Sequence, residues 1–223
     1  MTVDVDRRPL RFRTYPGSQR IDLPGCDFNI GASLGDVLQR RQSKRKFLLR
    51  PLELAIVSQL LYTSYGLRGY RKVDGQWTYD RPSPSAGGLY PLELYVATQA
   101  VEGLGDGIYH YDARAHQLEL RHTGLVHPDL ANMTIGQDMI RDANLVIIIS
   151  AIFQRTMWKY GQRGYRYVWL DAGHVGQNFY LVAEALGLGQ VSIGGFFDDE
   201  LHRLLELPEA EEEVIYLICI GQL

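Results

Sequence analysis

Some segments of the chain have the hydrophobic pattern of strands, and others repeat hydrophobic residues every three to four positions, as helices do. These patterns predict the secondary structure. A continuous Ile- and Val-rich run after Asn144 has the pattern of a strand buried on both faces. The runs Ile-Tyr-His-Tyr and Gln-Leu-Glu-Leu on either side of a turn at 112–114 are typical of a hairpin. Strands are therefore predicted over residues 92–97, both halves of 107–120, 144–152, 191–193 and 214–220.

Apolar residues spaced three and four positions apart predict the helices. Ser33 stands three residues before Asp36, which is a capping-box spacing with Asp in place of the usual Glu or Gln. The first helix therefore starts at Ser33 and ends within the basic run 40–46. Gly187 is a natural stop for the longest helix. Further helices are predicted immediately after Pro51 and over residues 128–142, 169–186 and 199–205.

The remaining segments lack a clear period. Residues 1–32 read as an N-terminal arm rich in Arg and Pro, either disordered or laid across the body or a partner subunit. Residues 66–88 are rich in Gly, Pro and Ser and predict a long functional loop. Because helices and strands mix without regular βαβ alternation, we expect a single α+β domain over 33–223.

Composition narrows the class of protein. The chain has 223 residues, of which 46% are hydrophobic and 22% charged, with a net charge of −3. This balance argues against a nucleic-acid partner. Two cysteines, Cys26 and Cys219, are too few for a disulfide scaffold or a cysteine-based zinc site. No signal peptide or membrane-length apolar run is visible, so we expect a cytoplasmic protein without a membrane partner.

Some motifs have better explanations than the chemistry they suggest. Gly31-Ala-Ser-Leu-Gly35 matches a nucleophile elbow, but no convincing buried strand precedes it, and helix capping explains Ser33 better. Asp171 and His174 share a helix face and could in principle ligate a metal. No other ligand motif accompanies them, so no metal site is predicted.

The basic segment 41–45 is a candidate phosphate site. Arg41, Ser43 and Arg45 bring two guanidinium groups and a hydroxyl together where the first helix ends. A phosphomonoester favours forked, permanently charged donors of this kind. Basic residues also stabilise the C-terminal end of any helix, and this structural alternative stays open.

Two stretches of nearly bare main chain are candidates for contact with a flat ring. Ser85, Ala86, Gly87 and Gly88 follow stiffening prolines and have almost no side-chain volume, and a second bare patch surrounds Gly194 and Gly195. Between them in sequence stand Lys159 and Tyr160. Adjacent Lys and Tyr side chains can form a proton-transfer pair, although such a dipeptide is also often structural.

Four segments, taken in this order, resemble the nitroreductase-like FMN oxidoreductases. The similarity extends to the SagB-type azoline dehydrogenases, which oxidise thiazolines and oxazolines in ribosomally made peptides. It covers residues 34–221. The segments that carry it are Arg-x-Ser-x-Arg at 41–45, Pro-Ser-Ala-Gly-Gly-Leu-Tyr-Pro-Leu-Glu-Leu-Tyr at 84–95, Lys-Tyr-Gly-x-Arg-Gly-Tyr-Arg at 159–166 and Ala-Gly-His-Val-Gly-Gln-Asn at 172–178.

The resemblance implies a central, mostly antiparallel sheet flanked by helices. It also implies an intertwined homodimer with FMN at the subunit interface. Arg41, Ser43 and Arg45 match the positions at the phosphate and ribityl end. The positions along the isoalloxazine ring, donated by the second subunit, match Pro84, Ser85, Ala86 and Gly87. Gln137 is similar to a residue at the ribityl or pyrimidine edge, and the positions near the reactive nitrogen match Gly194 and Gly195.

For the reaction, the resemblance implies hydride transfer to the flavin while Tyr160, assisted by Lys159, removes a proton from an azoline ring. The substrate is a small molecule or a peptide, which a peptide-modifying partner enzyme would present. Two alternatives remain open: an NAD(P)H-dependent nitro- or quinone reductase, and a flavin-binding scaffold subunit without turnover.

Two departures from the family pattern bear on these alternatives. Gly194 stands where many nitroreductases have Glu, which weakens the expectation of nicotinamide docking. The sequence ends at Leu223 without further basic residues, so phosphate binding would depend mainly on Arg41 and Arg45. Gly173 and Gly176 predict close packing of the long helix, either at a dimer interface or within one subunit.

Overall fold

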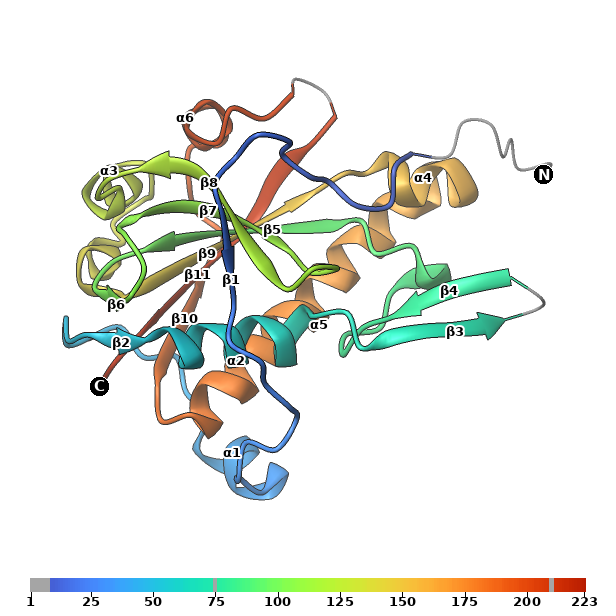
Figure 1. Cartoon of the computed structure of the whole chain (residues 1–223). Coiled ribbons are helices and arrows are strands. Elements are labelled where there is room, and N and C mark those ends of the chain that lie inside the picture. Colours follow the sequence, from blue (N-terminus) through green and yellow to red (C-terminus); the bar gives the residue numbers. More distant parts are fainter. Residues whose placement is uncertain (1–8, 74–75, 209–210) are drawn as a thin grey trace.

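The computed structural model describes residues 9–73, 76–208 and 211–223. Its centre is a seven-stranded sheet in the order β1-β8-β7-β5-β9-β11-β10, in which every neighbouring pair is antiparallel (Figure 1). The strands are β1 (Arg20–Asp22), β5 (Leu92–Thr98), β7 (Gly107–Asp112), β8 (Gln117–Thr123), β9 (Leu145–Ala151), β10 (Gly189–Ile193) and β11 (Glu213–Gly221).

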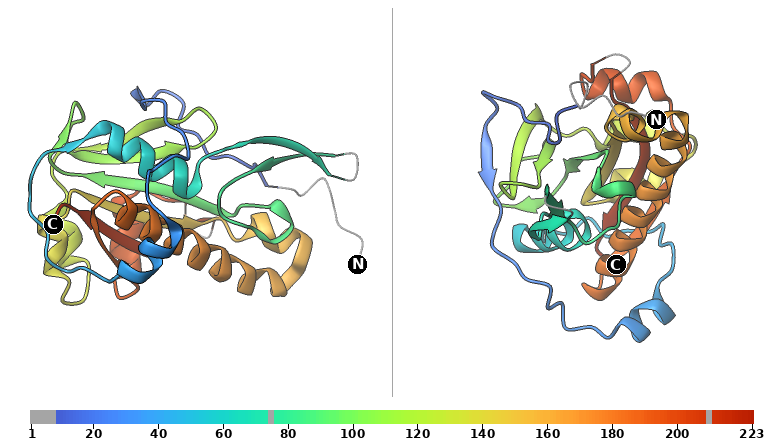
Figure 2. Two further views of the ribbon diagram at one scale, coloured as in Figure 1. Left: turned by 90° about the horizontal axis from the view of Figure 1, so that it is seen from below. Right: turned by 90° about the vertical axis from the view of Figure 1, so that its right-hand side faces the viewer.

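Helices cover both faces of the sheet (Figure 2). On one face lie α2 (Leu54–Tyr65) and the 22-residue α5 (Gly164–Ala185), and on the other lie α3 (His127–Asn132), the 3-10 turn η3 (Asp138–Asp142) and α6 (Asp198–Leu204). Helix α1 (Leu34–Arg40) lies beside the C-terminal end of α5, where Arg40 pairs with Glu184. The remaining elements are α4 (Gln154–Tyr160), η2 (Ala86–Gly88), η4 (Gly161–Arg163), the parallel pair β2 (Leu52–Glu53) and β6 (Val101–Glu102), and the hairpin β3 (Gly69–Val73) and β4 (Gln76–Asp80).

Strand β9 shows why the sheet needs helices on both sides. Leu145, Ile147 and Ile149 point into the core beneath α2 and α5, whereas Val146 and Ile148 point into the core beneath α3 and α6. All five are fully buried. A strand that is apolar at every position is stable only where both of its faces are covered. The α+β class and the antiparallel sheet predicted from the sequence are thus confirmed.

Several predicted helix boundaries are also confirmed. The Ser33 hydroxyl accepts a hydrogen bond from the backbone N–H of Asp36 at 3.2 Å, so Ser33 caps α1. Gly187 adopts a left-handed φ of +74° immediately after α5 and its capping residue Leu186. These short-range signals depend on neighbouring residues alone, which is why the sequence predicts them well.

Three predicted segments differ in the structure. The helix predicted over 128–142 is two short pieces, because Thr134 pairs with Phe196 and Gly136 turns the chain with a φ of +65°. The helix expected directly after Pro51 begins later, at Leu54, since 52–53 pair with β6. The loop predicted over 66–88 contains the hairpin β3–β4, whose tip lies outside the described residues.

The segment between β9 and α5 also differs from the sequence-based expectation. Helix α5 begins at Gly164 instead of Trp169, and α4 and η4 precede it. Gly161 ends α4 with a φ of +56°, so the chain turns there and re-enters a helix. Glycines and aromatic residues at 158–169 weaken the helical period of the sequence. The period therefore did not predict α4 or the first turns of α5.

The described part of the arm, residues 9–32, lies across its own chain. Strand β1 pairs with β8, although no strand period is visible there in the sequence. Arg13 Nε lies 2.6 Å from Glu212 Oε2, and the hydroxyls of Tyr15 and Tyr95 are 2.6 Å apart. Arg155 Nε donates to the carbonyl oxygen of Leu10 at 2.7 Å. The arm therefore covers polar groups that would otherwise lie open at this side of the sheet.

Those polar groups form a buried acidic cluster, defined here as Glu93, His110, Glu119 and Glu212. The His110 ring lies between Glu93 and Glu119, with both N–O distances at 3.0 Å. Burial alone would lower the pKa of His110, but its hydrogen bonds to the two carboxylates raise it to about 9. Burial would raise the pKa of Glu93, but Arg155, 2.6 Å away, and His110 hold it at about 2. Each carboxylate of the cluster has a cation beside it, and removing that cation would leave a buried charge unpaired.

Replacing Arg13 with Met should lower the free energy of unfolding by about 3 kcal/mol, because Glu212 would lose its cation while its side chain is fully buried. The matched control is Arg20→Met, which removes a pair between Glu119 and a half-exposed guanidinium and should cost less than about 1 kcal/mol. Urea unfolding at one protein concentration measures both. Equal losses would contradict the role given to the pair of Arg13 with Glu212.

Candidate functional site

The predicted phosphate-binding segment lies against the C-terminal half of α5. Ser43 Oγ is 2.9 Å from Tyr180 Oη, and the Arg41 guanidinium carbon lies 5.0 Å from the centroid of the Tyr180 ring. Tyr180 Oη also accepts a hydrogen bond from the backbone N–H of Ser192 at 3.1 Å. Arg45 is exposed and makes no ion pair with any described residue. The segment thus presents cations and a hydroxyl beside the end of β10.

Unsatisfied polar atoms lie next to this segment. The side chain of Gln190 is 1% exposed, and neither its amide nitrogen nor its oxygen has a hydrogen-bond partner among the described residues. Ser192 Oγ is likewise buried and unpartnered. Ser43 pairs with Gln190 through the backbone, so these groups lie close to the arginines. Buried polar atoms without partners are costly, and a ligand bound beside the arginines would supply the missing bonds.

The bare main chain at 194–195 follows directly from β10. Ile135 N donates to the Gly195 carbonyl oxygen at 3.2 Å, and Gln137 Nε2 donates to the Ile135 carbonyl oxygen at 2.9 Å. Gln137 therefore lies near Gly195. We call the following set the arginine half-site: Arg41, Ser43, Arg45, Gln137, Tyr180, Gln190, Ser192, Gly194 and Gly195.

A cavity of about 370 Å³ adjoins Gly194. It is lined by Trp169, Gly173, Phe196 and Tyr216, among others. A Cβ placed on Gly173 or Gly194 would meet no atom within 4 Å, so the backbone on both sides is open to a flat ligand. The arginines, the hydroxyl and the unpartnered amide can donate hydrogen bonds to a phosphate and to polar groups of a ligand. The cavity beside them is lined by aromatic residues. Together they fit a phosphorylated nucleotide with a flat ring.

The second group of predicted residues lies at the other half of α5. Ser85 Oγ donates to Asp171 Oδ2 at 2.5 Å, and Ala86 N donates to Asp171 Oδ1 at 3.4 Å. Tyr90 N donates to Ser85 Oγ at 2.9 Å. Burial raises the pKa of Asp171 to about 6, and the hydrogen bonds from Ser85 and Ala86 oppose that rise. Asp171 therefore binds the loop.

The backbone of Gly87 contacts the Lys-Tyr pair. Gly87 has a φ of +63°, and a Cβ there would lie 2.6 Å from Tyr160 Oη and 3.1 Å from Lys159 Nζ. Lys159 Nζ is 5.4 Å from the centroid of the Tyr160 ring, and Tyr167 packs edge-on against that ring. We call the following set the Lys-Tyr half-site: residues 84–88, Lys159, Tyr160 and Asp171. Only a residue without a side chain at 87 permits this approach.

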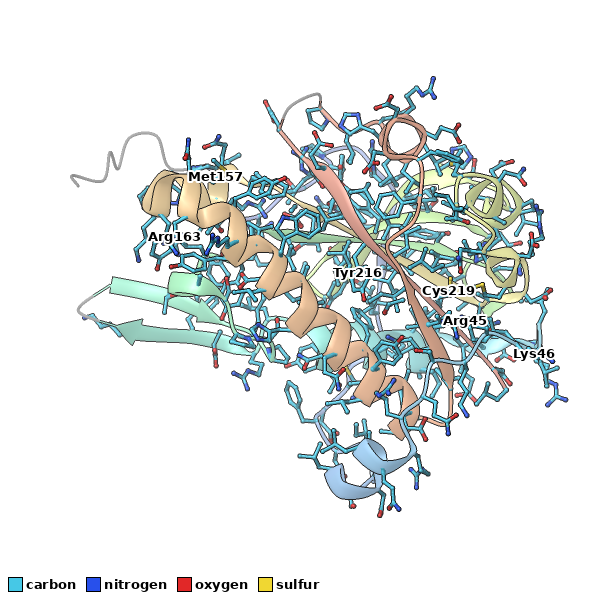
Figure 3. The ribbon with its side chains drawn as sticks, turned by 180° about the vertical axis from the view of Figure 1, so that it is seen from behind. Arg45, Lys46, Met157, Arg163, Tyr216 and Cys219 are labelled. Atoms are coloured by element: carbon cyan, nitrogen blue, oxygen red, sulfur yellow. The ribbon has the colours of Figure 1, made fainter. Side chains whose placement is uncertain are left out.

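The two half-sites lie apart within one chain. Asp171 and Tyr180 are nine residues apart on α5, which is about 13.5 Å along the axis and about two and a half turns. They therefore project from opposite faces of the helix. Figure 3 shows the same separation, with Arg163 at one end of α5 and Arg45 toward the other. The structure brings the predicted residues together as two groups instead of one.

Sequence reasoning missed several residues of these groups. Tyr180, Gln190 and Ser192 carry no motif, and only their spatial convergence identifies them. Asp171 was considered only as a metal ligand. Of the two helix glycines, Gly176 packs within the chain, since a Cβ there would lie 3.0 Å from the Tyr216 ring, whereas Gly173 faces open space.

The described residues contain no group of three or more His, Cys, Asp or Glu side chains that could hold a metal ion. No helix in that part of the chain is long and apolar enough to cross a membrane.

An antiparallel sheet flanked by helices, with a basic segment and bare loops along one long helix, defines a protein of the α+β class. The sequence profile of the nitroreductase family matches residues 38–222, so the chain belongs to that family. Its members are oxidoreductase enzymes, and so is this chain.

Two curated relatives show how far the similarity reaches. A nitroreductase-like protein of Methanocaldococcus jannaschii is 40% identical over 195 residues, covering 86% of this chain and 92% of the relative. The microcin B17-processing protein of Escherichia coli is 28% identical over 134 residues, covering 58% of this chain and 49% of the relative.

Two solved structures share the fold. A nitroreductase-like structure from Anabaena variabilis has a TM-score of 0.79 and 30% identity, covering 99% of this chain and 42% of the longer chain. The E. coli microcin synthetase complex with a truncated pro-peptide contains a chain with a TM-score of 0.68 and 22% identity, covering 93% of this chain and 79% of its own. At that identity the likeness shows the fold alone.

Substitution of Gly87 by Ala should lower oxidoreductase turnover at least tenfold, because the added methyl group displaces Tyr160 Oη. Gly88→Ala is the matched control, since its φ of +62° imposes the same backbone strain but its methyl group would approach Thr78 Oγ1 at 3.3 Å and Tyr90 Cε2 at 4.0 Å instead of Tyr160. Steady-state rates and melting temperatures of both variants distinguish displacement of Tyr160 from backbone strain. Similar loss of turnover in the two would show that strain, not Tyr160, is responsible.

Proposed function

We propose that this chain is an FMN-dependent dehydrogenase that oxidises azoline rings in a peptide and acts as a homodimer. In this proposal residues 33–223 form the FMN-binding domain, and residues 1–32 form an arm. The observation that carries the proposal is the contact of Lys159 and Tyr160 with Gly87. It joins a proton-transfer pair to the loop that the family resemblance assigns to the flavin ring.

FMN fits the arginine half-site on several counts. Arg41 and Arg45 provide the cations for a phosphate, and Ser43 provides a hydroxyl. The unpartnered amide of Gln190 and hydroxyl of Ser192 suit the ribityl hydroxyls or the polar edge of the ring. Gly194 and Gly195 expose backbone where a ring would approach.

The separation of the half-sites favours a dimer. Because Asp171 and Tyr180 project from opposite faces of α5, one chain cannot close both half-sites around one flavin. In a two-fold dimer with antiparallel α5 helices, the Lys-Tyr half-site of one copy would lie beside the arginine half-site of the other. The exposed side chains of Trp169 and Leu170 give α5 an apolar face for that contact.

The proposed reaction removes two electrons and two hydrogens from the azoline, as a hydride and a proton. When bound, FMN supplies the acceptor for the hydride. Tyr160 Oη receives the proton, and Lys159 Nζ lies on the same side, beside the Gly87 backbone. Dioxygen is the proposed final electron acceptor.

Two comparisons support a peptide substrate presented by a partner. One relative is a microcin-processing protein, and one structural neighbour is a synthetase complex with a pro-peptide bound. Aromatisation of a ring in a large peptide requires an active site that opens to the surface, and Lys159 is exposed.

Purified protein should bind FMN and show a flavin absorption spectrum. Arg41→Ala should weaken FMN binding at least tenfold, because a phosphate contact is lost. Arg50→Ala, which removes an exposed arginine outside the half-site, is the control. Fluorescence titration with FMN measures both affinities. Protein that stays colourless after incubation with excess FMN would refute the cofactor assignment.

Lys159→Ala and Tyr160→Phe should keep FMN and lose turnover of azoline peptides at least a hundredfold. Mixed dimers give a sharper test of the shared site. Coexpression of Arg41→Ala with Tyr160→Phe should restore about a quarter of wild-type activity, because half of the dimers are mixed and each mixed dimer has one intact site.

Homodimers of each single variant provide the baseline for this complementation. A mixture no more active than the two baselines would place both half-sites of one active site in the same chain. Flavin content measured in every sample separates loss of cofactor from loss of chemistry.

A nicotinamide-dependent nitro- or quinone reductase is the second candidate, because this chain matches 92% of the length of the nitroreductase-like M. jannaschii relative. NADPH at micromolar concentration should bleach the flavin rapidly in stopped-flow experiments if this candidate holds. Slow bleaching by NADPH and fast bleaching by an azoline peptide would favour the dehydrogenase.

A further inference from the structure

We propose that Asp171 is a positioning residue of the Lys-Tyr half-site, which holds the turn 85–88 where Gly87 contacts Tyr160. The inference rests on the proposed function for the reaction affected, but the anchoring of the turn stands without it. Asp171 lies on α5 and touches neither Lys159 nor Tyr160 in any described contact. Its influence would pass through the loop backbone.

The contacts form a continuous path. Asp171 Oδ2 accepts from Ser85 Oγ at 2.5 Å, and Asp171 Oδ1 accepts from Ala86 N at 3.4 Å. The next residue is Gly87, whose backbone meets Tyr160. Gly88 N donates to the Ser85 carbonyl oxygen at 3.0 Å and closes the turn. A shift of Ser85 would therefore move Gly87 relative to the phenol.

Arg81 fixes the start of the loop independently of Asp171. Asp171 therefore sets the position of the later residues, 85–88. Arg81 is 5% exposed, and its Nη1 donates to the Tyr65 carbonyl oxygen at 2.7 Å. Its guanidinium carbon lies 4.2 Å from the centroid of the Tyr65 ring. Pro82 and Pro84 stiffen the chain between this anchor and Ser85. One side of the loop is thus tied to α2 and the other to α5.

An ionised carboxylate at this position is a cost to the fold. Burial raises the pKa of Asp171 to about 6, above its ordinary value, so the protonated form is the one that favours folding. That contribution to stability is lost as the pH rises through 6, and at neutral pH the charged side chain destabilises the protein. A buried charge kept at such a cost is typical of functional sites.

The titratable groups that face Asp171 are few. His174, one turn further along α5 and exposed, lowers the pKa of Asp171 through its charge. Tyr65 of α2 is coupled to Asp171 electrostatically and is fully buried and neutral. Among described residues no arginine or lysine pairs with the carboxylate. The hydrogen bonds from the turn are therefore its main stabilisation in the charged form.

The first test requires neither substrate nor flavin. Hydrogen exchange of the purified chain should show protection of the Gly88 and Tyr90 amides falling about tenfold in Asp171→Asn and in Ser85→Ala. Ser85→Thr keeps the hydroxyl and should retain the protection. The melting temperature of Asp171→Asn at pH 8 should be no lower than wild type, since a buried charge is removed. Unchanged exchange in both loss variants would overturn the proposal.

The second test asks whether Asp171 acts through Tyr160. Asp171→Asn should lower kcat 10- to 100-fold with little change in KM for the peptide. In a Tyr160→Phe background the same substitution should have no further effect, because the group being positioned is gone. Additive losses would show that Asp171 is only structural.

The pH profile provides the third readout. Wild-type kcat should fall as the pH drops through about 6, where the carboxyl takes up a proton, and this step should be absent in Asp171→Asn. Faster exchange of the turn in a protein that never oxidises azolines would refute the proposed function and leave the anchoring intact. Normal azoline oxidation with unchanged exchange would do the reverse.

Discussion

Helix α5 fixes both halves of the candidate site and keeps them apart. Ser43 reaches it through Tyr180, and Ser85 reaches it through Asp171. Because a helix is rigid over its 22 residues, the distance between these two attachment points cannot change without unfolding. Everything else about the site follows from that constraint. The basic segment and the bare loop come from distant parts of the sequence, yet each has a definite place along one axis. A second copy of the same helix is then the simplest means of bringing unlike halves together.

The acidic cluster under the arm joins the arm, the sheet and α4. Glu93, Glu119 and Glu212 lie within or beside the sheet, where an unpaired carboxylate would cost several kcal/mol. Arg13 reaches Glu212 from the arm, and Arg155 reaches Glu93 from α4. Arg155 also holds the Leu10 carbonyl. The same helix that positions Lys159 and Tyr160 is therefore tied by its first turn to the cluster and the arm. Packing at the sheet and geometry at the site are linked through α4.

The sequence predicted what depends on near neighbours or on uniform burial. The apolar run of β9, the Ser33 cap and the Gly187 stop all act over a few residues, and all were confirmed. It failed where distant segments decide the outcome. Thr134 leaves the helical path because Phe196 pairs with it, and β1 becomes a strand because β8 offers an open edge. The same limit applies to the site. Motifs identified Ser43, Gly87 and Lys159, but Tyr180, Gln190 and Asp171 carry no local signal and emerge only from their contacts.

Because the site is divided into two half-sites, a movement between two subunits would affect only one part of the proposed chemistry. Lys159, Tyr160 and Gly87 pack together within one chain, and Asp171 ties the turn of Gly87 to α5. The Lys-Tyr pair and the backbone of Gly87 therefore move as one body. A shift of one subunit against the other would change the distance from this body to a flavin held by the partner, but not the geometry inside it. The relative position of the two subunits, rather than the local arrangement of Lys159 and Tyr160, would then govern the rate of hydride transfer. Proton transfer and hydride transfer would thus respond to different variants, because one depends on contacts within a chain and the other on contacts between chains.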